Sequence, residues 1–251
     1  MAMLLTKYDG KVSFPVFVEP KIDGVRCLIK NKIAKSRTGK VFQNMDLIIS
    51  QLDPKFIWDG ELYIKDSSFA QVSGLLRQKC ALKSKVEKLE FHVFDVKINK
   101  LYSERRQIIT ENIIESKNIK IVSSFIVNSE KEILEFHKLF TSQNYEGTVI
   151  KQKDNVYTYG RSDQVQKLKD TFDSEFEIIG FTPDENGLVV WVCENDNIPF
   201  SVRPKGTDSE RKTFYQNGKD YIGKYLTVQY KEIGSGNVPR EPIGLGIRSI
   251  L

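Results

Sequence analysis

The alternation of apolar and polar residues predicts a chain built from short strands with a few helices between them. β-Branched and aromatic residues recur at every second position, which is typical of half-buried strands. This pattern covers 56–64, 89–96, 121–127 and 147–151, and an apolar run at 16–18 predicts an earlier strand. We therefore expect residues 1–171 to form an α+β domain built mainly on antiparallel strands.

Helical segments are expected between these strands. Ser67 and Ser68 can cap a helix over 69–77, and residues 103–116 form another candidate helix. The run Ser-Glu-Lys-Glu at 129–132 has the form of a capping box, and it predicts a helix that continues to about residue 140.

The pattern changes after residue 170. Short strands are predicted at 175–181, 188–194, 198–203 and 225–233, with a turn at 183–187 and one helix at 208–216. Several short strands with a single helix are typical of a small β-barrel of the OB type. We therefore expect two domains, 1–171 and 172–251, with a hinge at 171–174.

Composition excludes several classes of protein. The 251 residues are 40% hydrophobic and 28% charged, without an apolar run long enough to span a membrane or a recognisable secretory signal. Three separated cysteines, none in a C-x-x-C pair, predict reduced thiols in an intracellular protein, and two histidines exclude a histidine-rich metal site. The net charge of +5 is compatible with a nucleic-acid partner but does not require one.

The strongest chemical signal is the run K-I-D-G-V-R at residues 21–26. Lys21 stands at the end of a predicted strand and is followed at once by Asp23, a glycine and Arg26. Most lysines are solvated surface residues, whereas this setting suits a lysine that acts as a nucleophile.

Five further clusters could serve such a lysine, although each has a simpler interpretation. S-R-T-G at 36–39 and D-G-E at 59–61 could be polar turns, and F-D at 94–95 could belong to the core. E-G-T-V-I-K at 146–151 places a carboxylate just before a strand. K-L-K at 167–169 places two lysines on one face of a strand, which favours an anion between them over an exposed edge.

In this order the clusters resemble the motifs of the covalent nucleotidyltransferases, and among these the small viral ATP-dependent DNA ligases. The similarity continues through Y-G-R-S at 159–162, F-Y-Q-N at 214–217, Y-I-G-K at 221–224 and the stretch 239–248, so it covers nearly the whole chain. It implies a nucleotidyltransferase domain followed by an OB domain, which together seal 3′-hydroxyl/5′-phosphate nicks in duplex DNA. The implied reaction passes through a covalent lysyl–AMP and a DNA–adenylate.

The resemblance also implies a role for each matching residue. Lys21 would be the nucleophile and Asp23 a supporting polar group. ATP would be bound with the help of Glu19, Arg26, Glu61, Phe94, Glu146, Lys167 and Lys169, of which the two lysines would hold the α-phosphate. Mg²⁺, for which Mn²⁺ can substitute, would be held by Asp59, Glu61 and Glu146. Arg37 and Arg161 would contact the DNA at the nick.

Arg240 and Arg248 resemble the residues that orient the departing pyrophosphate, a task suited to the planar guanidinium. Glu241 departs from the family pattern, in which an aromatic residue is common at this position. Larger relatives carry an additional N-terminal DNA-binding domain, and some insert a latch hairpin into the OB domain. We expect neither here, because few residues precede Lys21 and the region 181–200 fits only a tight hairpin.

The sequence therefore predicts an intracellular monomer, of viral or phage origin or acting in the cytoplasm or nucleoid of its host. Its partner would be nicked double-stranded DNA, with no membrane contact and with binding that weakens in salt. RNA ligases and capping guanylyltransferases share the lysine motif, although 36–39 and 239–248 favour a DNA ligase. A non-catalytic OB module that binds single strands is the alternative outside enzymes. NAD as the donor is disfavoured, since NAD-dependent ligases carry a cysteine-rich zinc module.

Overall fold

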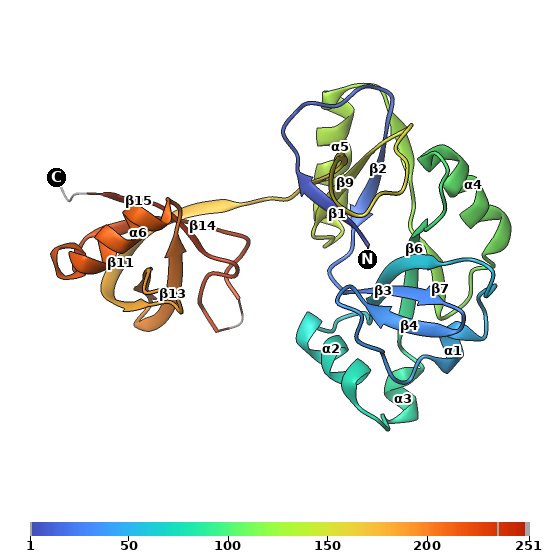
Figure 1. Cartoon of the computed structure of the whole chain (residues 1–251), viewed down its shortest axis with the longest axis horizontal. Coiled ribbons are helices and arrows are strands. Elements are labelled where there is room, and N and C mark those ends of the chain that lie inside the picture. Colours follow the sequence, from blue (N-terminus) through green and yellow to red (C-terminus); the bar gives the residue numbers. More distant parts are fainter. Residues whose placement is uncertain (1, 235, 249–251) are drawn as a thin grey trace. The chain divides into compact units, whose positions relative to one another are not determined.

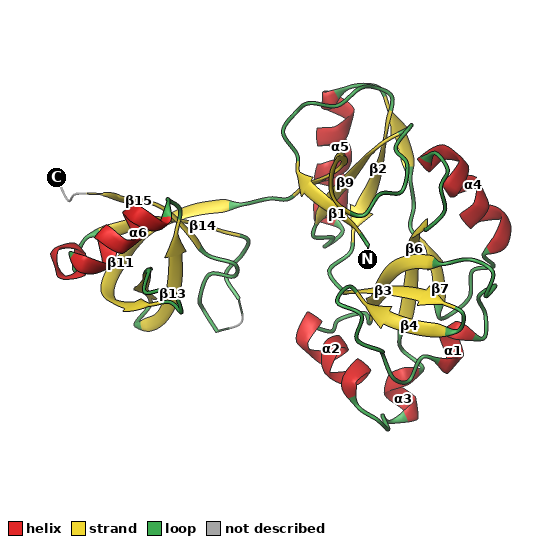
Figure 2. Cartoon of the chain, viewed as in Figure 1, coloured by secondary structure: helices red, strands yellow, loops and turns green. Residues whose placement is uncertain are grey.

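The computed structural model describes residues 2–234 and 236–248, and the chain divides into two compact units, 1–168 and 169–251 (Figure 1). Strands supply the interior of each unit and helices lie outside them (Figure 2). None of the described helices is long and apolar enough to cross a membrane. The α+β class predicted from the residue pattern is confirmed.

The first unit contains two sheets. The first sheet has the order β1-β10-β9-β2-β8, in which β1 and β10 are parallel and the other pairs antiparallel. Its strands are β1 (Met3–Lys7), β2 (Val16–Lys21), β8 (Phe125–Val127), β9 (Gly147–Gln152) and β10 (Gly160–Leu168).

The first sheet is covered by one amphipathic helix. Helix α5 (Glu130–Ser142) packs on β2 and β9, where its Ile133 meets Val16, Val18 and Ile150. Ser129 accepts the first hydrogen bond of the helix from the Glu132 backbone, as the capping box predicted. The carboxylate of Glu132 instead accepts from the Asn128 backbone, one residue before the cap.

The second sheet has the order β4-β3-β5-β6-β7, antiparallel except for β6 and β7. One of its faces packs on helices and forms the larger core of the unit. The strands are β3 (Val25–Lys30), β4 (Ile33–Ser36), β5 (Trp58–Tyr63), β6 (Glu90–Val96) and β7 (Ile119–Ile121). The helices of this half are α1 (Asp46–Ile49), α2 (Phe69–Arg77), α3 (Lys83–Val86) and α4 (Tyr102–Asn112).

A β-bulge interrupts the pairing of β5 with β6. Asp59 pairs with Asp95 and Gly60 with Val93, so Phe94 is the extra residue on β6. Because a bulge shifts the two-residue alternation, Phe91, Val93 and Val96 all reach the helix-covered core. The neighbours Phe94 and Asp95 are left to face the opposite side together.

The second unit is a closed barrel with the strand order β11-β12-β13-β15-β14. Its core is centred on Trp191, with Phe176, Phe200 and Leu226 around it. Asp196 and Asn197 connect β12 to β13, and both take the positive φ of a tight hairpin turn. The elements are β11 (Phe172–Pro183), β12 (Val189–Asn195), β13 (Ile198–Pro204), α6 (Asp208–Gln216), the 3₁₀ turn η1 (Gly218–Tyr221), β14 (Tyr225–Tyr230) and β15 (Ile243–Arg248).

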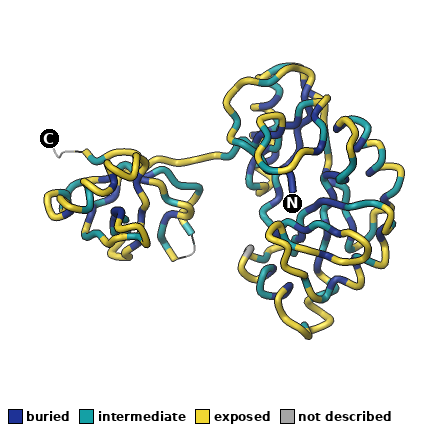
Figure 3. The backbone as a smooth tube through the Cα atoms, viewed as in Figure 1, coloured by how far each residue is buried: buried dark blue, intermediate teal, exposed yellow. Residues whose placement is uncertain are grey.

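Two predicted elements differ clearly from those observed, and some observed elements were not predicted. The single strand expected at 121–127 is two strands, β7 and β8, which belong to different sheets. Helix α4 ends four residues before the predicted 116, and the elements that were not predicted include β1, β4, β15, α1 and α3. The hydrophobic patterns predict the other strands because the buried residues of each unit follow its strands (Figure 3). The position of a hinge at 171–174 stays a prediction.

Candidate active site

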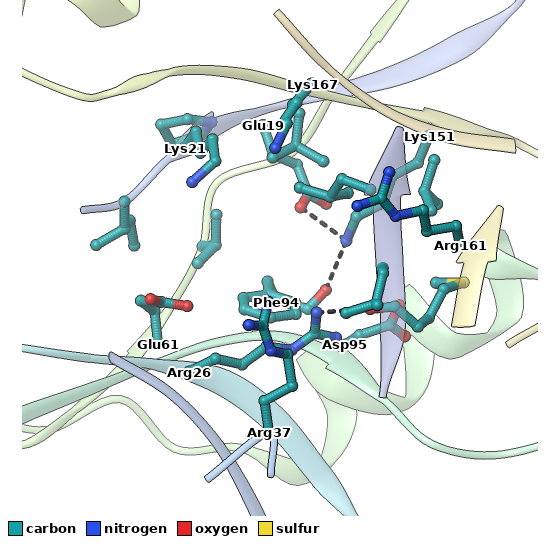
Figure 4. Close-up of a pocket in the computed structure, with 18 residues that line it drawn as sticks. Glu19, Lys21, Arg26, Arg37, Glu61, Phe94, Asp95, Lys151, Arg161 and Lys167 are labelled. Carbon is teal, nitrogen blue, oxygen red and sulfur yellow. Dashed lines mark hydrogen bonds and ion pairs between the residues drawn. The ribbon is translucent and has the colours of Figure 1, made fainter. Parts of the chain in front are cut away.

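A pocket of about 290 Å³ lies between the two sheets of the first unit (Figure 4). Lys21 and Glu19 reach it from β2, Lys151 from β9 and Lys167 from β10. The second sheet contributes residues from its open face. The predicted site residues that line the pocket are Glu19, Lys21, Arg26, Arg37, Glu61, Phe94, Arg161 and Lys167.

Lys21 ends β2 and is half-buried at the pocket wall. Its Nζ forms an ion pair with Glu146, the residue just before β9, and the Glu146 backbone N–H donates to the Lys21 carbonyl at 2.8 Å. Lys167 points into the same space from β10 (Figure 4). A lysine paired with a carboxylate and facing a second cation suits attack on a phosphate.

Glu61 carries the clearest pKa shift in the pocket. Burial raises the pKa of its carboxyl to about 8, although the charges of Lys21 and Arg26 oppose this. Asp59 and Glu146 add to the rise by repulsion. Glu61 is therefore largely protonated at neutral pH as long as no metal ion is bound beside it.

Asp59 is fully buried beside the pocket, where it holds Arg26. Its two carboxylate oxygens accept from Nε and Nη2 of Arg26, at 3.0 and 2.6 Å. Tyr157 donates a third bond at 2.5 Å, and burial together with Asp59 raises the pKa of its hydroxyl well above the usual range. This geometry makes Asp59 a positioning group for Arg26.

Phe94 and Arg26 form the floor of the pocket. The β6 bulge turns Phe94 into it, and the Arg26 guanidinium lies 5.2 Å from the centre of the ring. A flat aromatic ring that lines a pocket can stack on a purine base.

The opposite wall carries a buried network that the sequence did not indicate. Lys151 Nζ lies 2.8 Å from a Glu19 oxygen and donates to the Phe94 carbonyl at 2.9 Å (Figure 4). The Tyr102 hydroxyl donates to the other Glu19 oxygen. Lys151 thus joins β9 of the first sheet to β6 of the second. A lysine inside the apolar strand 147–152 was the available signal.

Two motif glycines are required by close packing between strands. A Cβ on Gly24 would lie 2.3 Å from the Leu62 carbonyl oxygen, and one on Gly60 would lie 2.5 Å from the His92 carbonyl oxygen. Real Cβ atoms do not approach so closely, so the glycine of D-G-E lets β6 lie against β5.

Asp95, the second residue of F-D, has a structural role. Arg105 of α4 is fully buried and contacts both Asp95 oxygens, at 2.7 and 3.2 Å. It also donates to the carbonyl and the side chain of Asn155, which follows β9.

Several predicted site residues lie outside the pocket. Asp23 and Asp59 are not among its lining residues, and Glu146 meets it through Lys21. Lys169, Arg240 and Arg248 belong to the second unit.

Within the second unit these cations are engaged with carboxylates. Arg240 pairs with Glu232, and Arg248 pairs with Glu175 at 2.7 Å. Glu241, the residue that departs from the family pattern, lies 3.9 Å from Lys169.

The carboxylates fit a magnesium ion only together with substrate oxygens. Among the residues that the structure describes, no group of three His, Cys, Asp or Glu side chains could hold a metal by itself. Glu61 and Glu146 act electrostatically on one another beside Lys21. Mg²⁺ commonly uses one or two carboxylates, water and phosphates, so this pair fits.

Comparison with known proteins decides the family. Residues 4–169 match the family described as the ATP dependent DNA ligase domain, and residues 185–248 match the DNA ligase OB-like domain. The chain belongs to the ATP-dependent DNA ligases. The resemblance inferred from the motifs is thereby confirmed, as is the order of a nucleotidyltransferase domain and an OB-like domain.

Individual ligases are similar over most of the chain. A DNA ligase of African swine fever virus is 28% identical over 92% of this chain, which spans 63% of the length of that relative. A DNA ligase of Haemophilus influenzae is 26% identical over 95% of this chain and 88% of its own length.

Solved ligase structures share the fold. A Lig E DNA ligase, from a study of DNA binding with a minimal scaffold, superposes with a TM-score of 0.85 at 21% identity, covering 98% of both chains. The Chlorella virus DNA ligase–adenylate has a TM-score of 0.60 at 28% identity, covering 100% of this chain and 98% of the other.

Proposed function

We propose that this protein is an ATP-dependent DNA ligase that seals nicks in duplex DNA through a lysyl–AMP on Lys21. The observation that carries the proposal is the pairing of Lys21 with Glu146 at a pocket that also presents Lys167 and a base-stacking ring. Few structural roles would place a lysine paired with a carboxylate, a second lysine and an aromatic floor around one cavity.

Three phosphoryl transfers follow from this arrangement. Lys21 Nζ, as the neutral amine, attacks the α-phosphorus of ATP, forms a phosphoramidate and releases pyrophosphate, and the amine proton passes to water. A 5′-phosphate oxygen at the nick then displaces Lys21 and takes the AMP. The 3′-hydroxyl oxygen finally attacks the 5′-phosphorus, which closes the backbone and releases AMP. Catalysis of this kind depends on positioning and on charge neutralisation.

The remaining residues bind and orient the reactants. Phe94 stacks on the adenine, Glu19 faces its amino group, and Arg26 contacts the ribose. Lys167 holds the α-phosphate, together with Lys169 from the second unit. Arg37 and Arg161 face the 5′-phosphate, and Arg240 and Arg248 orient the leaving pyrophosphate. Asp23 supports the phosphate site.

Glu61 and Glu146 would hold Mg²⁺ against the phosphates, with Asp59 behind them. When bound, the ion would neutralise charge on the phosphate oxygens as it shifts during transfer. We place the domain boundary at 171/172, and we expect a monomer that acts inside the cell, where ATP and DNA occur together.

The test is intact-mass measurement after incubation with ATP and Mg²⁺. We expect one AMP on the wild type, removed by acid but not by mild base, and none on Lys21→Ala or Lys21→Arg. Lys7→Ala, at the end of β1, serves as the control. Persistence of the adduct in Lys21→Ala would overturn the proposal.

Two further comparisons fix the substrates. ATP should form the adduct and GTP should not, which separates a ligase from a guanylyltransferase. Nicked DNA should be sealed and nicked RNA left open, which separates it from an RNA ligase.

A further inference from the structure

A second hollow in the first unit lies beside the active-site pocket. It is an open groove of about 600 Å³ on the β3–β4 side of the second sheet. Its charged lining residues are Lys30, Lys35, Arg37 and Lys97, and no acidic side chain is among the lining residues that the structure describes.

Strand alternation places this groove on the same face of the sheet as the pocket. Arg26, Leu28 and Lys30 alternate along β3 and share one face, while Cys27 and Ile29 enter the helix-covered core. Arg26 lines the pocket, whereas Leu28 and Lys30 line the groove. Lys35 stands opposite Leu28 on β4 and so extends the same face.

Arg37 joins the two hollows. It is an exposed side chain that lines both, and it rises beside Arg26 toward the pocket (Figure 4). A polymer whose end lies in the pocket can therefore leave across Arg37 into the groove.

The cations of the groove are available for an anion. Within residues 2–234 and 236–248, none of these four side chains is engaged in an ion pair, in contrast to Lys21, Arg26 and Lys151. Lys97 Nζ lies 4.5 Å from the centre of the exposed Tyr159 ring, a contact that does not neutralise its charge. Cations gathered in a groove without carboxylates repel one another unless an anion lies there.

We propose that this groove, lined by Lys30, Lys35 and Lys97, binds the sugar–phosphate backbone of the DNA strand whose 5′-phosphate reacts at the nick. The proposal rests on the proposed function, because the AMP acceptor must be the 5′ end of a strand. That end alone carries a terminal phosphate, which suits the guanidinium of Arg37 at the passage. The strand with the 3′-hydroxyl brings no such charge.

The experiment compares two triple variants in which equal charge is removed. The groove variant is Lys30→Ala/Lys35→Ala/Lys97→Ala, and the control variant is Lys85→Ala/Lys117→Ala/Lys138→Ala, whose lysines are exposed elsewhere on the same unit. Binding is measured to a nicked duplex with a 3′-dideoxy end, which cannot be sealed, over a series of salt concentrations.

We expect the groove variant to bind about ten- to a hundredfold more weakly, and its slope of log K against log salt to be shallower by about 2 to 3. The control variant should stay close to the wild type. Lysyl–AMP formation from ATP without DNA should be unchanged in both. Loss of the adduct in the wild type itself would instead refute the proposed function.

Trimming the DNA identifies the strand. The 5′-phosphorylated strand is shortened to a few nucleotides, and binding affinity is measured again. The affinity of the wild type should then fall to nearly that of the groove variant for the full-length duplex. The affinity of the groove variant itself should change little. Equal losses in both proteins would overturn the proposal and assign the groove to the template strand. Equal binding by the groove and control variants would overturn it as well.

Discussion

At the scale of single residues, the active site depends on charges kept in place by neighbours. Asp59 holds Arg26, Glu146 holds Lys21, and Lys151 holds Glu19. In each pair a partly or fully buried charge would be costly without its partner. The pocket is therefore prepared for a charged ligand before one binds.

Glu61 should make stability depend on pH. Its folded-state pKa of about 8 lies above the ordinary value of 4.5, so the folded protein retains a proton that the unfolded chain releases. The free energy of unfolding should therefore fall between about pH 5 and 8 in the wild type. Glu61→Gln should lack this decrease, as measured by urea unfolding at pH 5.5, 7.0 and 8.5. A constant difference between the two proteins across these pH values would contradict the assignment.

Removing Lys151 should destabilise the protein through the charge left behind. Lys151→Met leaves Glu19 buried without its counter-ion and the Phe94 carbonyl without its donor. We expect a loss of about 3 to 5 kcal/mol in the free energy of unfolding.

Adding Glu19→Gln should recover more than half of that loss, because the amide is neutral and still accepts from Tyr102. Denaturant unfolding of the two single variants and the double variant checks this. Additive losses would show that the pair is not coupled.

At the scale of elements, β5 and β6 form the part of the second sheet on which the proposed chemistry depends. Gly60 permits their close approach, and the bulge turns Phe94 into the pocket. Arg105 then fixes the end of β6 through Asp95 and joins it to the loop after β9.

Gly60→Ala should therefore cost about 1 to 3 kcal/mol of stability and weaken nucleotide binding, because the new Cβ would meet the His92 carbonyl and the Phe91 ring. Gly180→Ala is the matched control, since a Cβ there would meet only Val192, at 3.8 Å. Thermal unfolding and titration with ATP measure the two effects. If both substitutions lowered stability by the same small amount, β5 and β6 would be able to move apart and accept the new Cβ.

The sequence predicted most elements and most of the charged pocket residues, because both follow local patterns. Strand period and capping residues found β2, β9 and α6, and ordered motifs found Lys21, Glu61 and Lys167. Local patterns could not reveal that 121–127 crosses between sheets, since sheet membership is set by distant partners. The Lys151 network was missed for the same reason, because Glu19, Tyr102 and Phe94 are far apart along the chain.

At the scale of the whole molecule, the proposed reaction uses residues from both units. Lys21 and the nucleotide pocket belong to the first unit, while Arg240 and Arg248 belong to the barrel. Carboxylates of the barrel hold both arginines, so in the proposed role pyrophosphate would replace Glu232 and Glu175 as their partners.

Arg240→Ala and Arg248→Ala should consequently lose lysyl–AMP formation by at least about tenfold. Both should still seal a nick that already carries AMP, since pyrophosphate leaves only in the first step. The measurement is single-turnover ligation of pre-adenylylated nicked DNA beside adduct formation from ATP, with Arg203→Ala, exposed on β13, as the control. An equal loss in both assays would assign the arginines to a later step.

The β6 bulge also limits how this chain can vary in length. Upstream of Phe94 the odd-numbered residues enter the core, and downstream the even-numbered Val96 does. Deleting one residue would restore regular alternation along β6. Either the Phe94 ring or Val96 would then have to move to the opposite face of the sheet. Insertions and deletions in β6 should thus be far less tolerated than substitutions. A library of single-codon deletions, selected for ligation, should yield few or no active variants with a deletion at 90–96.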